Sequence, residues 1–275
     1  MEAASAAVGS HGPLHGKVAV VTGGNGGIGK GVALQLAARG ATVVINGRSA
    51  AKAEAVLAEI RALGATAHFV AGDVRDKADM DRLAAEAARL CGGVDIVVAN
   101  AGGDDDQGRS TQVRAPFGDI DLQRLSAFVA QAIPAKLQPV QSLLPQLRAR
   151  GGSVVFIVSE GGRTPTPGQT GMASFAGGLV MATKVLAREL AKDQIRVNCV
   201  CVTVVRDSPS WTAAFERPDG VGDHHRRQYE KIIARAPLGI AAPPDIGGVV
   251  ASLVSDDGRY ITGSAISPTG GLTVH

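Results

Sequence analysis

The sequence predicts an α/β fold, a single doubly wound, seven-stranded parallel sheet of the Rossmann type with helices on both faces. Short apolar runs alternate along the chain with stretches of helical length and period. The 275 residues are 45% hydrophobic but only 3% aromatic, so the core must be built from Ala, Val, Leu and Ile, as in strands buried on both faces. A glycine-rich turn separates the first apolar run from the first helical stretch, which marks the start of a βα series.

The glycine-rich turn runs from Thr22 to Gly29, between a predicted strand that begins at Lys17 and a helical run over 30–39. It fits Gly-x-Gly-x-x-Gly at positions 24, 26 and 29, and Thr-Gly-x-x-x-Gly-x-Gly at positions 22, 23, 27 and 29. Glycines let the backbone pass close to a pyrophosphate, and the amides and dipole at the helix start favour its negative charge. The turn therefore predicts a dinucleotide site. Its expected cofactor-binding residues are Gly23, Asn25, Gly27, Ile28 and Gly29.

The other elements follow in alternation. Strands are predicted at 41–46, 66–71, 94–99, 153–159, 195–202 and 264–267, and helices at 50–63, 76–90, 121–150, 171–192 and 245–255. The helical region 121–150 contains Pro134 and Pro139 and is expected to be kinked or split. No internal repeat or linker divides the chain, so we expect one domain over 16–275 behind a flexible tail at 1–15. Ligands should bind outside the carboxyl ends of the strands.

Composition argues against several classes of partner. The net charge of +3, without basic runs interleaved with aromatics, does not suggest nucleic acid. No run of about 18 apolar residues suggests a membrane span, and the first residues lack the pattern of a signal peptide. Cys91, Cys199 and Cys201 form no metal or disulfide pattern, so a reducing, cytoplasmic location without a metal site is expected.

Further short motifs accompany the turn. They are Asp73-Val74, Asn100-Ala101-Gly102, Ile195-Arg196-Val197-Asn198, Tyr260-Ile261-Thr262-Gly263 and Gly270-Gly271. With them the chain resembles the short-chain dehydrogenase/reductase family over 17–271. The resemblance implies that Asp73 and Val74 border the adenine, that Asn100, Ala101 and Gly102 support the cofactor, and that 206–235 is a substrate lid. It also implies a small-molecule substrate and a homodimer or homotetramer.

The residues after the second strand bear on the choice of cofactor. NAD-dependent members of the family carry an acidic residue there, whereas this chain has Gly47, Arg48 and Ser49. A carboxylate would repel a 2′-phosphate, and an arginine can bind it with two hydrogen bonds. NADP(H), held by Arg48 and Ser49, is therefore expected. The alternative is that Arg48 is only a solvated residue at a helix start.

The resemblance also implies a catalytic serine, tyrosine, lysine and asparagine. Ser159 stands at the serine position. Counting 13 residues on gives Met172 in place of the tyrosine, and four more give Ala176 in place of the lysine. Counting back from Leu143-Leu144-Pro145 puts Ala132 in place of the asparagine. Ser159 is thus the only predicted catalytic residue, although it could instead cap the strand end, and the neighbouring Glu160 is expected at the surface.

Three functions fit this pattern. The first is an NADPH-dependent ketoreductase-like oxidoreductase in which proton transfer is non-standard: a phenol or enol beside the carbonyl of a polyketide-like substrate would protonate its own alkoxide. A water or a lid residue, such as His224, His225 or Tyr229, is the other possible donor. The second is a catalytically silent subunit that forms a hetero-oligomer with an active relative. The third is a non-redox lyase or cyclase that uses the same cavity.

Overall fold

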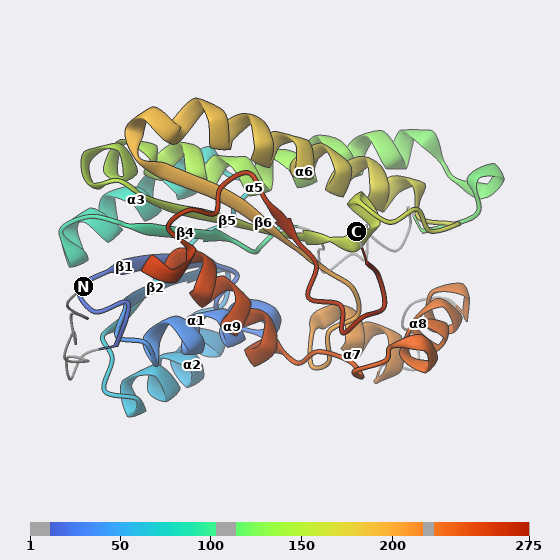
Figure 1. Ribbon diagram of the computed structural model, residues 1–275, viewed down its shortest axis with the longest axis horizontal. Coiled ribbons are helices and arrows are strands. Elements are labelled where there is room, and N and C mark those ends of the chain that lie inside the picture. Colours follow the sequence, from blue (N-terminus) through green and yellow to red (C-terminus); the bar gives the residue numbers. More distant parts are fainter. Residues whose placement is uncertain (1–11, 103–113, 217–222, 275) are drawn as a thin grey trace, which may run out of the picture.

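The computed structural model, which describes residues 12–102, 114–216 and 223–274, has the fold that the sequence predicts (Figure 1). Its seven-stranded sheet has the order β3-β2-β1-β4-β5-β6-β7, and all neighbouring strands are parallel. The strands are β1 (Val18–Thr22), β2 (Thr42–Gly47), β3 (Ala67–Ala71), β4 (Ile96–Ala99), β5 (Gly152–Ser159), β6 (Ile195–Val202) and β7 (Ala265–Ile266).

Helices cover both faces of the sheet (Figure 1). One face carries α1 (Gly27–Ala37), α2 (Ala50–Ala62) and α9 (Pro243–Val254), and the other α3 (Lys77–Cys91), α5 (Leu122–Arg150) and α6 (Thr170–Leu190). Alternate strand residues enter two separate cores. Val20 and Val97 belong to the core under α3, α5 and α6, whereas Val21 and Val98 belong to the core under α1, α2 and α9. Burial on both faces explains why the strands read as continuous apolar runs.

The described part of the chain also contains short 3₁₀ turns. They are η1 (Phe117–Asp119), η2 (Glu160–Gly162), η3 (Ala191–Asp193) and η4 (Asp256–Gly258).

Helix α6 is, within the described ranges, the one helix long and apolar enough to cross a membrane by length and composition. Its buried residues, among them Phe175 and Leu179, belong to the core that covers β5 and β6. The apolar composition of α6 is therefore explained by its packing on the sheet.

Residues 121–150 were expected to be kinked or split, and the expected split is wrong. Helix α5 is continuous over 29 residues, with Pro134, Pro139 and Pro145 inside it. Asp121 caps its start by accepting from the amides of residues 123 and 124 at 2.8 and 3.3 Å. The helix buries Leu143 among its core residues, so tertiary packing offsets the hydrogen bonds that the prolines remove.

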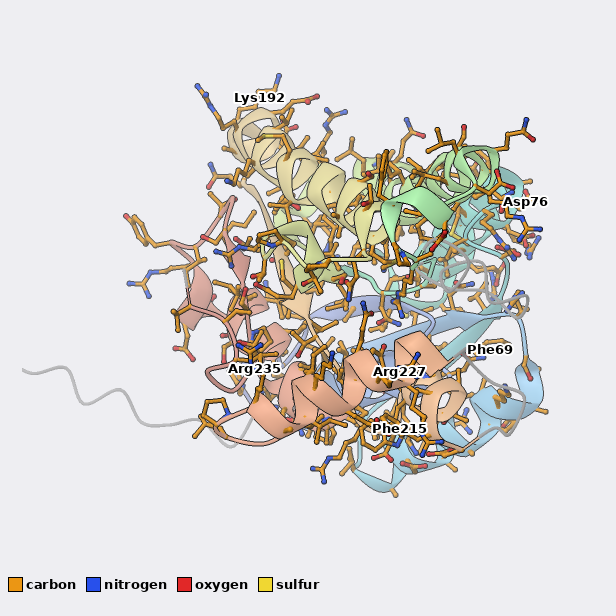
Figure 2. The ribbon with its side chains drawn as sticks, turned by 90° about the vertical axis from the view of Figure 1, so that its right-hand side faces the viewer. Phe69, Asp76, Lys192, Phe215, Arg227 and Arg235 are labelled. Atoms are coloured by element: carbon orange, nitrogen blue, oxygen red, sulfur yellow. The ribbon has the colours of Figure 1, made fainter. Side chains whose placement is uncertain are left out.

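The segment 206–235, expected to be a substrate lid, contains α7 (Pro209–Phe215) and α8 (Asp223–Arg235). The Phe215 ring packs between Trp211 at 4.6 Å and Tyr229 at 6.1 Å, measured between ring centroids. In Figure 2, α8 crosses the front of the molecule with Arg227 and Arg235 along it and Phe215 close by. The segment thus has a small apolar core of its own, and α7 and α8 lie at the end of the sheet to which β6 leads (Figure 1).

The packed domain includes residues 12–15, which the sequence assigned to the flexible tail. Leu14 is only 1% exposed, and its amide donates to the carbonyl of Arg39 at 2.9 Å. A Cβ on Gly12 would lie 2.3 Å from the same Arg39 oxygen, so the turn is fitted closely to the end of α1. Residues 1–11 lie outside the described part of the chain.

Candidate cofactor and active site

The strand order reverses between β1 and β4, which makes the carboxyl ends of these strands the expected ligand crevice. Thr22 ends β1, and its Oγ1 accepts from the amides of Asn100 and Ala101 at 3.0 and 3.1 Å. In return, the side-chain amide of Asn100 donates to the Thr22 carbonyl at 3.1 Å. The predicted cofactor residues Asn100 and Ala101 therefore hold the glycine-rich turn against β4.

The turn itself fits a pyrophosphate. Gly23 and Gly27 have φ values of +65° and +49°, in the left-handed region that favours glycine. A Cβ on Gly29 would lie 2.1 Å from the Gly23 oxygen and 2.7 Å from the Asn100 side-chain nitrogen. Among the described residues no side chain caps the start of α1, and its first turn holds no acidic residue. The amides at this helix start therefore suit an anion.

The turn is linked to the end of β2 through Asn25. Its side-chain amide donates to the carbonyl of Ser49 at 3.3 Å. A Cβ on Gly47 would lie 2.6 Å from this amide nitrogen, so Asn25 occupies the space that a side chain at position 47 would need. The glycine at position 47 thus has a packing reason, and an acidic residue there would require Asn25 to move.

The predicted adenosine-side residues gather at the ends of β2 and β3. Arg48 is exposed, and Ser49 caps α2 by accepting from the Lys52 amide at 3.3 Å. Asp73 is held by the Arg75 side chain at 2.6 and 2.9 Å. That hydrogen bonding lowers the pKa of the Asp73 carboxyl, and the charge of Arg48 lowers it further.

Of the other predicted residues, Val74 is 6% exposed and packs in the core, and Ile28 is half-buried. Gly102 has a φ of +102°, and a Cβ there would lie 2.6 Å from the Ala135 methyl. Gly102 is thus fitted against α5. Together the contacts bring the glycine-rich turn, the β2 end and the residues after β4 to one edge of the sheet.

Ser159 ends β5, where its Oγ accepts from the Gly161 amide at 3.2 Å and so caps η2. The three positions expected to carry tyrosine, lysine and asparagine hold buried residues of one apolar core: Met172, Ala176 and Ala132 are 4%, 0% and 4% exposed. Neither tyrosine of the chain stands beside Ser159 in sequence. Tyr229 packs in the apolar core of α7 and α8, and Tyr260 is 93% exposed.

Glu160 is not the surface carboxylate that the sequence suggests, because it is only 3% exposed. Its Oε2 accepts from Ser267 at 2.6 Å, and its Oε1 accepts from Thr164 at 2.9 Å and Thr273 at 3.2 Å. Glu160 therefore ties the C-terminal segment to the end of β5. His224 and His225 lie in α8, but their side chains are outside the described part of the structure.

Lys136 is a buried charge that sequence reasoning missed. It lies on α5 and is 2% exposed, and its Nζ donates to the carbonyl oxygens of Ala99, Asn100 and Ile157 at 3.2, 2.5 and 2.7 Å. Burial lowers the pKa of the Lys136 amine to about 7. One signal could have revealed it: position 136 lies on the helical stripe formed by Ala132, Pro139, Val140 and Leu143, all of which are buried.

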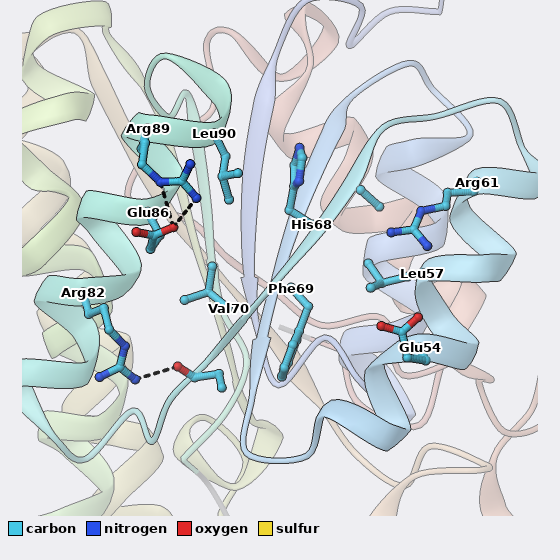
Figure 3. A pocket seen from close by; sticks show the side chains of 12 residues that line it. Glu54, Leu57, Arg61, His68, Phe69, Val70, Arg82, Glu86, Arg89 and Leu90 are labelled. Carbon is cyan, nitrogen blue, oxygen red and sulfur yellow. Dashed lines mark hydrogen bonds and ion pairs between the residues drawn. The ribbon is translucent and has the colours of Figure 1, made fainter.

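A separate groove of about 510 Å³ lies on the outer edge of the sheet, along β3 between α2 and α3 (Figure 3). Three of its charged groups have partners within it, through the Arg89–Glu86 ion pair at 2.7 Å and the Arg82 bond to the Ala71 carbonyl at 2.8 Å. None of the predicted cofactor or catalytic residues lines it. Within the described ranges, no group of three or more His, Cys, Asp or Glu residues could hold a metal ion.

Comparison with known proteins agrees with this geometry. Residues 17–218 match the family described as short chain dehydrogenase. The chain is 32% identical over 272 residues to dehydrogenase/reductase SDR family member 4 of Oryctolagus cuniculus, covering 98% of both. It is 33% identical over 259 residues to the 3-oxoacyl-[acyl-carrier-protein] reductase FabG of Staphylococcus aureus strain Mu50, covering 93% of this chain and 98% of the relative.

Two solved structures illustrate the shared fold. A 7α-hydroxysteroid dehydrogenase complexed with NADH and 7-oxo glycochenodeoxycholic acid superposes with a TM-score of 0.81 at 25% identity, covering 94% of each chain. Levodione reductase superposes with a TM-score of 0.82 at 25% identity, covering 94% of this chain and 98% of the other. The chain therefore belongs to the short-chain dehydrogenase/reductase family, whose members are oxidoreductases that use NAD(H) or NADP(H) to act on carbonyl or hydroxyl groups of small molecules.

Proposed function

We propose that this protein is an NADP(H)-dependent ketoreductase-like enzyme whose proton does not come from a tyrosine. The observation that carries the proposal is a contrast within one site. The glycine-rich turn is locked to Asn100 and its helix start is uncapped, whereas Met172, Ala176 and Ala132 fill the positions of proton delivery with buried apolar groups. Such a site keeps the means to bind a hydride donor and lacks the usual means to donate a proton.

The roles of the residues follow from their contacts. The bound cofactor would supply the hydride. Gly23, Gly27 and Gly29, with the amides at the start of α1, would hold the pyrophosphate. Ser159 accepts from the Gly161 amide, so its hydroxyl can point its own proton at a substrate carbonyl and polarise it. Hydride transfer then needs only proximity and this polarisation.

The remaining cofactor contacts are proposed by position. Arg48 and Ser49 would bind the 2′-phosphate, and Asp73 and Val74 would border the adenine. Asn25 and Ile28 would line the pyrophosphate turn, and Asn100, Ala101 and Gly102 would support the ribose side. Arg48 lies close enough to influence Asp73, which fits both residues facing one adenosine.

The alkoxide that forms must still be protonated. We propose that the substrate supplies this proton from an acidic hydroxyl beside its carbonyl, a phenol or an enol. Matched pairs of carbonyl compounds test this, one carrying the free hydroxyl and the other its methyl ether. NADPH oxidation should be at least about 100-fold faster with the free hydroxyl, within the range of general acid catalysis. Equal rates with both compounds would contradict substrate assistance.

Arg48→Ala should separate the two cofactors. Removing a charge-assisted bidentate contact costs about 1.5–3 kcal/mol, so NADPH affinity should fall about 10- to 100-fold while NADH affinity stays unchanged. Calorimetric titration measures both. Arg61→Ala, an exposed arginine at the other end of α2, is the matched control and should change neither affinity. An equal loss for both cofactors would mean that Arg48 does not contact the 2′-phosphate.

Two other functions remain open to test. The packing of Met172 and Ala176 in the core also suits a silent subunit that stabilises an active relative. Co-purification with another family member would favour that function, and NADPH oxidation by the protein alone would exclude it. A lyase or cyclase would convert its substrate without consuming NADPH, which product analysis would reveal in the same assay.

We also propose a cytoplasmic homodimer or homotetramer. Met181 and Val185, four residues apart on α6, are 58% and 55% exposed, so an apolar strip of this helix faces outwards. Light scattering of the purified protein decides between these states, and a monomer would contradict both.

A further inference from the structure

A buried charged group joins the ends of β4 and β5. It lies at none of the four positions at which catalytic residues are expected. Lys136 reaches these strand ends from α5, on the face of the sheet opposite α1. Its three carbonyl partners match the three donors of an ammonium group, at 3.2, 2.5 and 2.7 Å. A neutral amine would donate only two hydrogen bonds, so this set of acceptors favours the charged form.

The partners of Lys136 connect it to both halves of the candidate site. The carbonyl of Asn100 accepts its shortest bond, while the side-chain amide of Asn100 holds the glycine-rich turn through Thr22. The carbonyl of Ile157 accepts another, two residues before Ser159 on β5. One ammonium group therefore fixes the cofactor-side and substrate-side strand ends relative to each other.

We propose that Lys136 is a positioning residue that supplies from α5 the buried positive charge that the site lacks at Ala176 on α6. The inference rests on the proposed function, since it assumes that a nicotinamide cofactor binds at this edge of the sheet. A cation behind the carboxyl ends of β4 and β5 has a specific consequence. The oxidised nicotinamide ring is positively charged and the reduced ring is neutral, so Lys136 should disfavour NADP⁺ relative to NADPH.

The surroundings of Lys136 let its charge be controlled by pH. Burial alone lowers the pKa of this amine to about 7, without a contribution from a charged side chain of the described residues. The core that covers this face of the sheet is built from apolar side chains, among them Ala132, Phe175 and Ala176 on α5 and α6. Glu160, the carboxylate that follows β5, bonds instead to Ser267, Thr164 and Thr273. Below about pH 7 the site should therefore carry the charge, and above it the charge should disappear.

The test compares the dissociation constants of NADP⁺ and NADPH at pH 6 and pH 8.5, by calorimetry. For the wild type, the dissociation constant of NADP⁺ divided by that of NADPH should be roughly tenfold larger at pH 6 than at pH 8.5. For Lys136→Met, this ratio should equal the wild-type value at pH 8.5 and should not change with pH. Lys184→Met, which removes an exposed lysine from α6, is the matched control and should behave as the wild type. Titration of the 2′-phosphate affects both cofactors alike and cancels in the ratio.

Each outcome has a distinct meaning. A wild-type ratio that does not change between the two pH values, with both cofactors bound, would overturn the assignment of Lys136 and leave the proposed function intact. This holds even if Lys136→Met fails to fold, because the wild-type comparison does not need the variant. A variant that folds and keeps the wild-type pH dependence would also overturn it, since a lysine with a purely structural role would give that result. Binding of neither cofactor to the wild type would overturn the proposed function, and the assignment with it.

Discussion

Gly29→Ala is expected to disrupt the glycine-rich turn proposed to bind the cofactor, although alanine is the better helix former. A Cβ at position 29 would lie 2.1 Å from the Gly23 oxygen and 2.7 Å from the Asn100 side-chain nitrogen, so the turn and the Asn100 side chain that holds it must move apart. Displacing amides that bind a charged phosphate costs about 1.5–3 kcal/mol each. NADPH affinity should therefore fall by about 10- to 100-fold. Overpacking should also lower the free energy of unfolding by about 1–3 kcal/mol.

Gly248→Ala is the matched control, on α9 and outside the glycine-rich turn. A Cβ on Gly248 would meet no atom within 4 Å. This variant should bind NADPH nearly as the wild type does and should not unfold at a lower denaturant concentration. If both alanine variants bound NADPH normally, the close approach of Gly29 to Gly23 and Asn100 would not be what shapes the site.

Lys136 should make the stability of the protein depend on pH in an unusual direction. Its pKa is lowered from 10.5 to about 7 in the folded state, so the unfolded chain binds more protons between these values. Stability therefore rises with pH across this window, and the increment is lost as pH falls through about 7. Between pH 6 and pH 9 this one group should add about 2–3 kcal/mol to the free energy of unfolding.

Denaturant unfolding of the wild type and Lys136→Met at several pH values measures this increment. The quantity to compare is the difference between the two proteins at each pH, because the other titrating groups are shared. That difference should move in favour of the wild type by about 2–3 kcal/mol from pH 6 to pH 9. A constant difference would mean that the Lys136 pKa is the same in the folded and unfolded states.

The sequence predicted the sheet well because it depends on local patterns. Val20 and Val97 face one core and Val21 and Val98 the other, so each strand is apolar along its length and is visible without knowledge of its neighbours. The glycine-rich turn was recognisable because its requirement is steric and local, as the contacts of Gly29 illustrate. The pairing of Asn25 with Gly47 needed the structure, because it joins two turns of different strands.

The errors concern residues whose environment is set by distant parts of the chain. Pro134 and Pro139 suggested a kinked or split helix, but the packing of α5 on the sheet keeps it from splitting. The charge of Glu160 suggested the surface, yet Glu160 is buried by the C-terminal segment. Lys136, which the sequence analysis did not single out, is buried by the ends of β4 and β5. Apart from Thr164, which lies four residues after Glu160, the hydrogen-bond partners of both residues lie more than twenty residues away, and no local pattern records them.

The central claim, an intact NADP(H) site in a protein without the usual proton donor, is tested most directly without any substrate. Titration of the purified protein with NADPH and, separately, with NADH can be followed by quenching of its single tryptophan, Trp211, which packs on Phe215 beside the strand ends. We predict tight binding of NADPH, with at least about tenfold weaker binding of NADH. Binding of neither cofactor would contradict the claim and would make the silent-subunit function the better explanation of this chain.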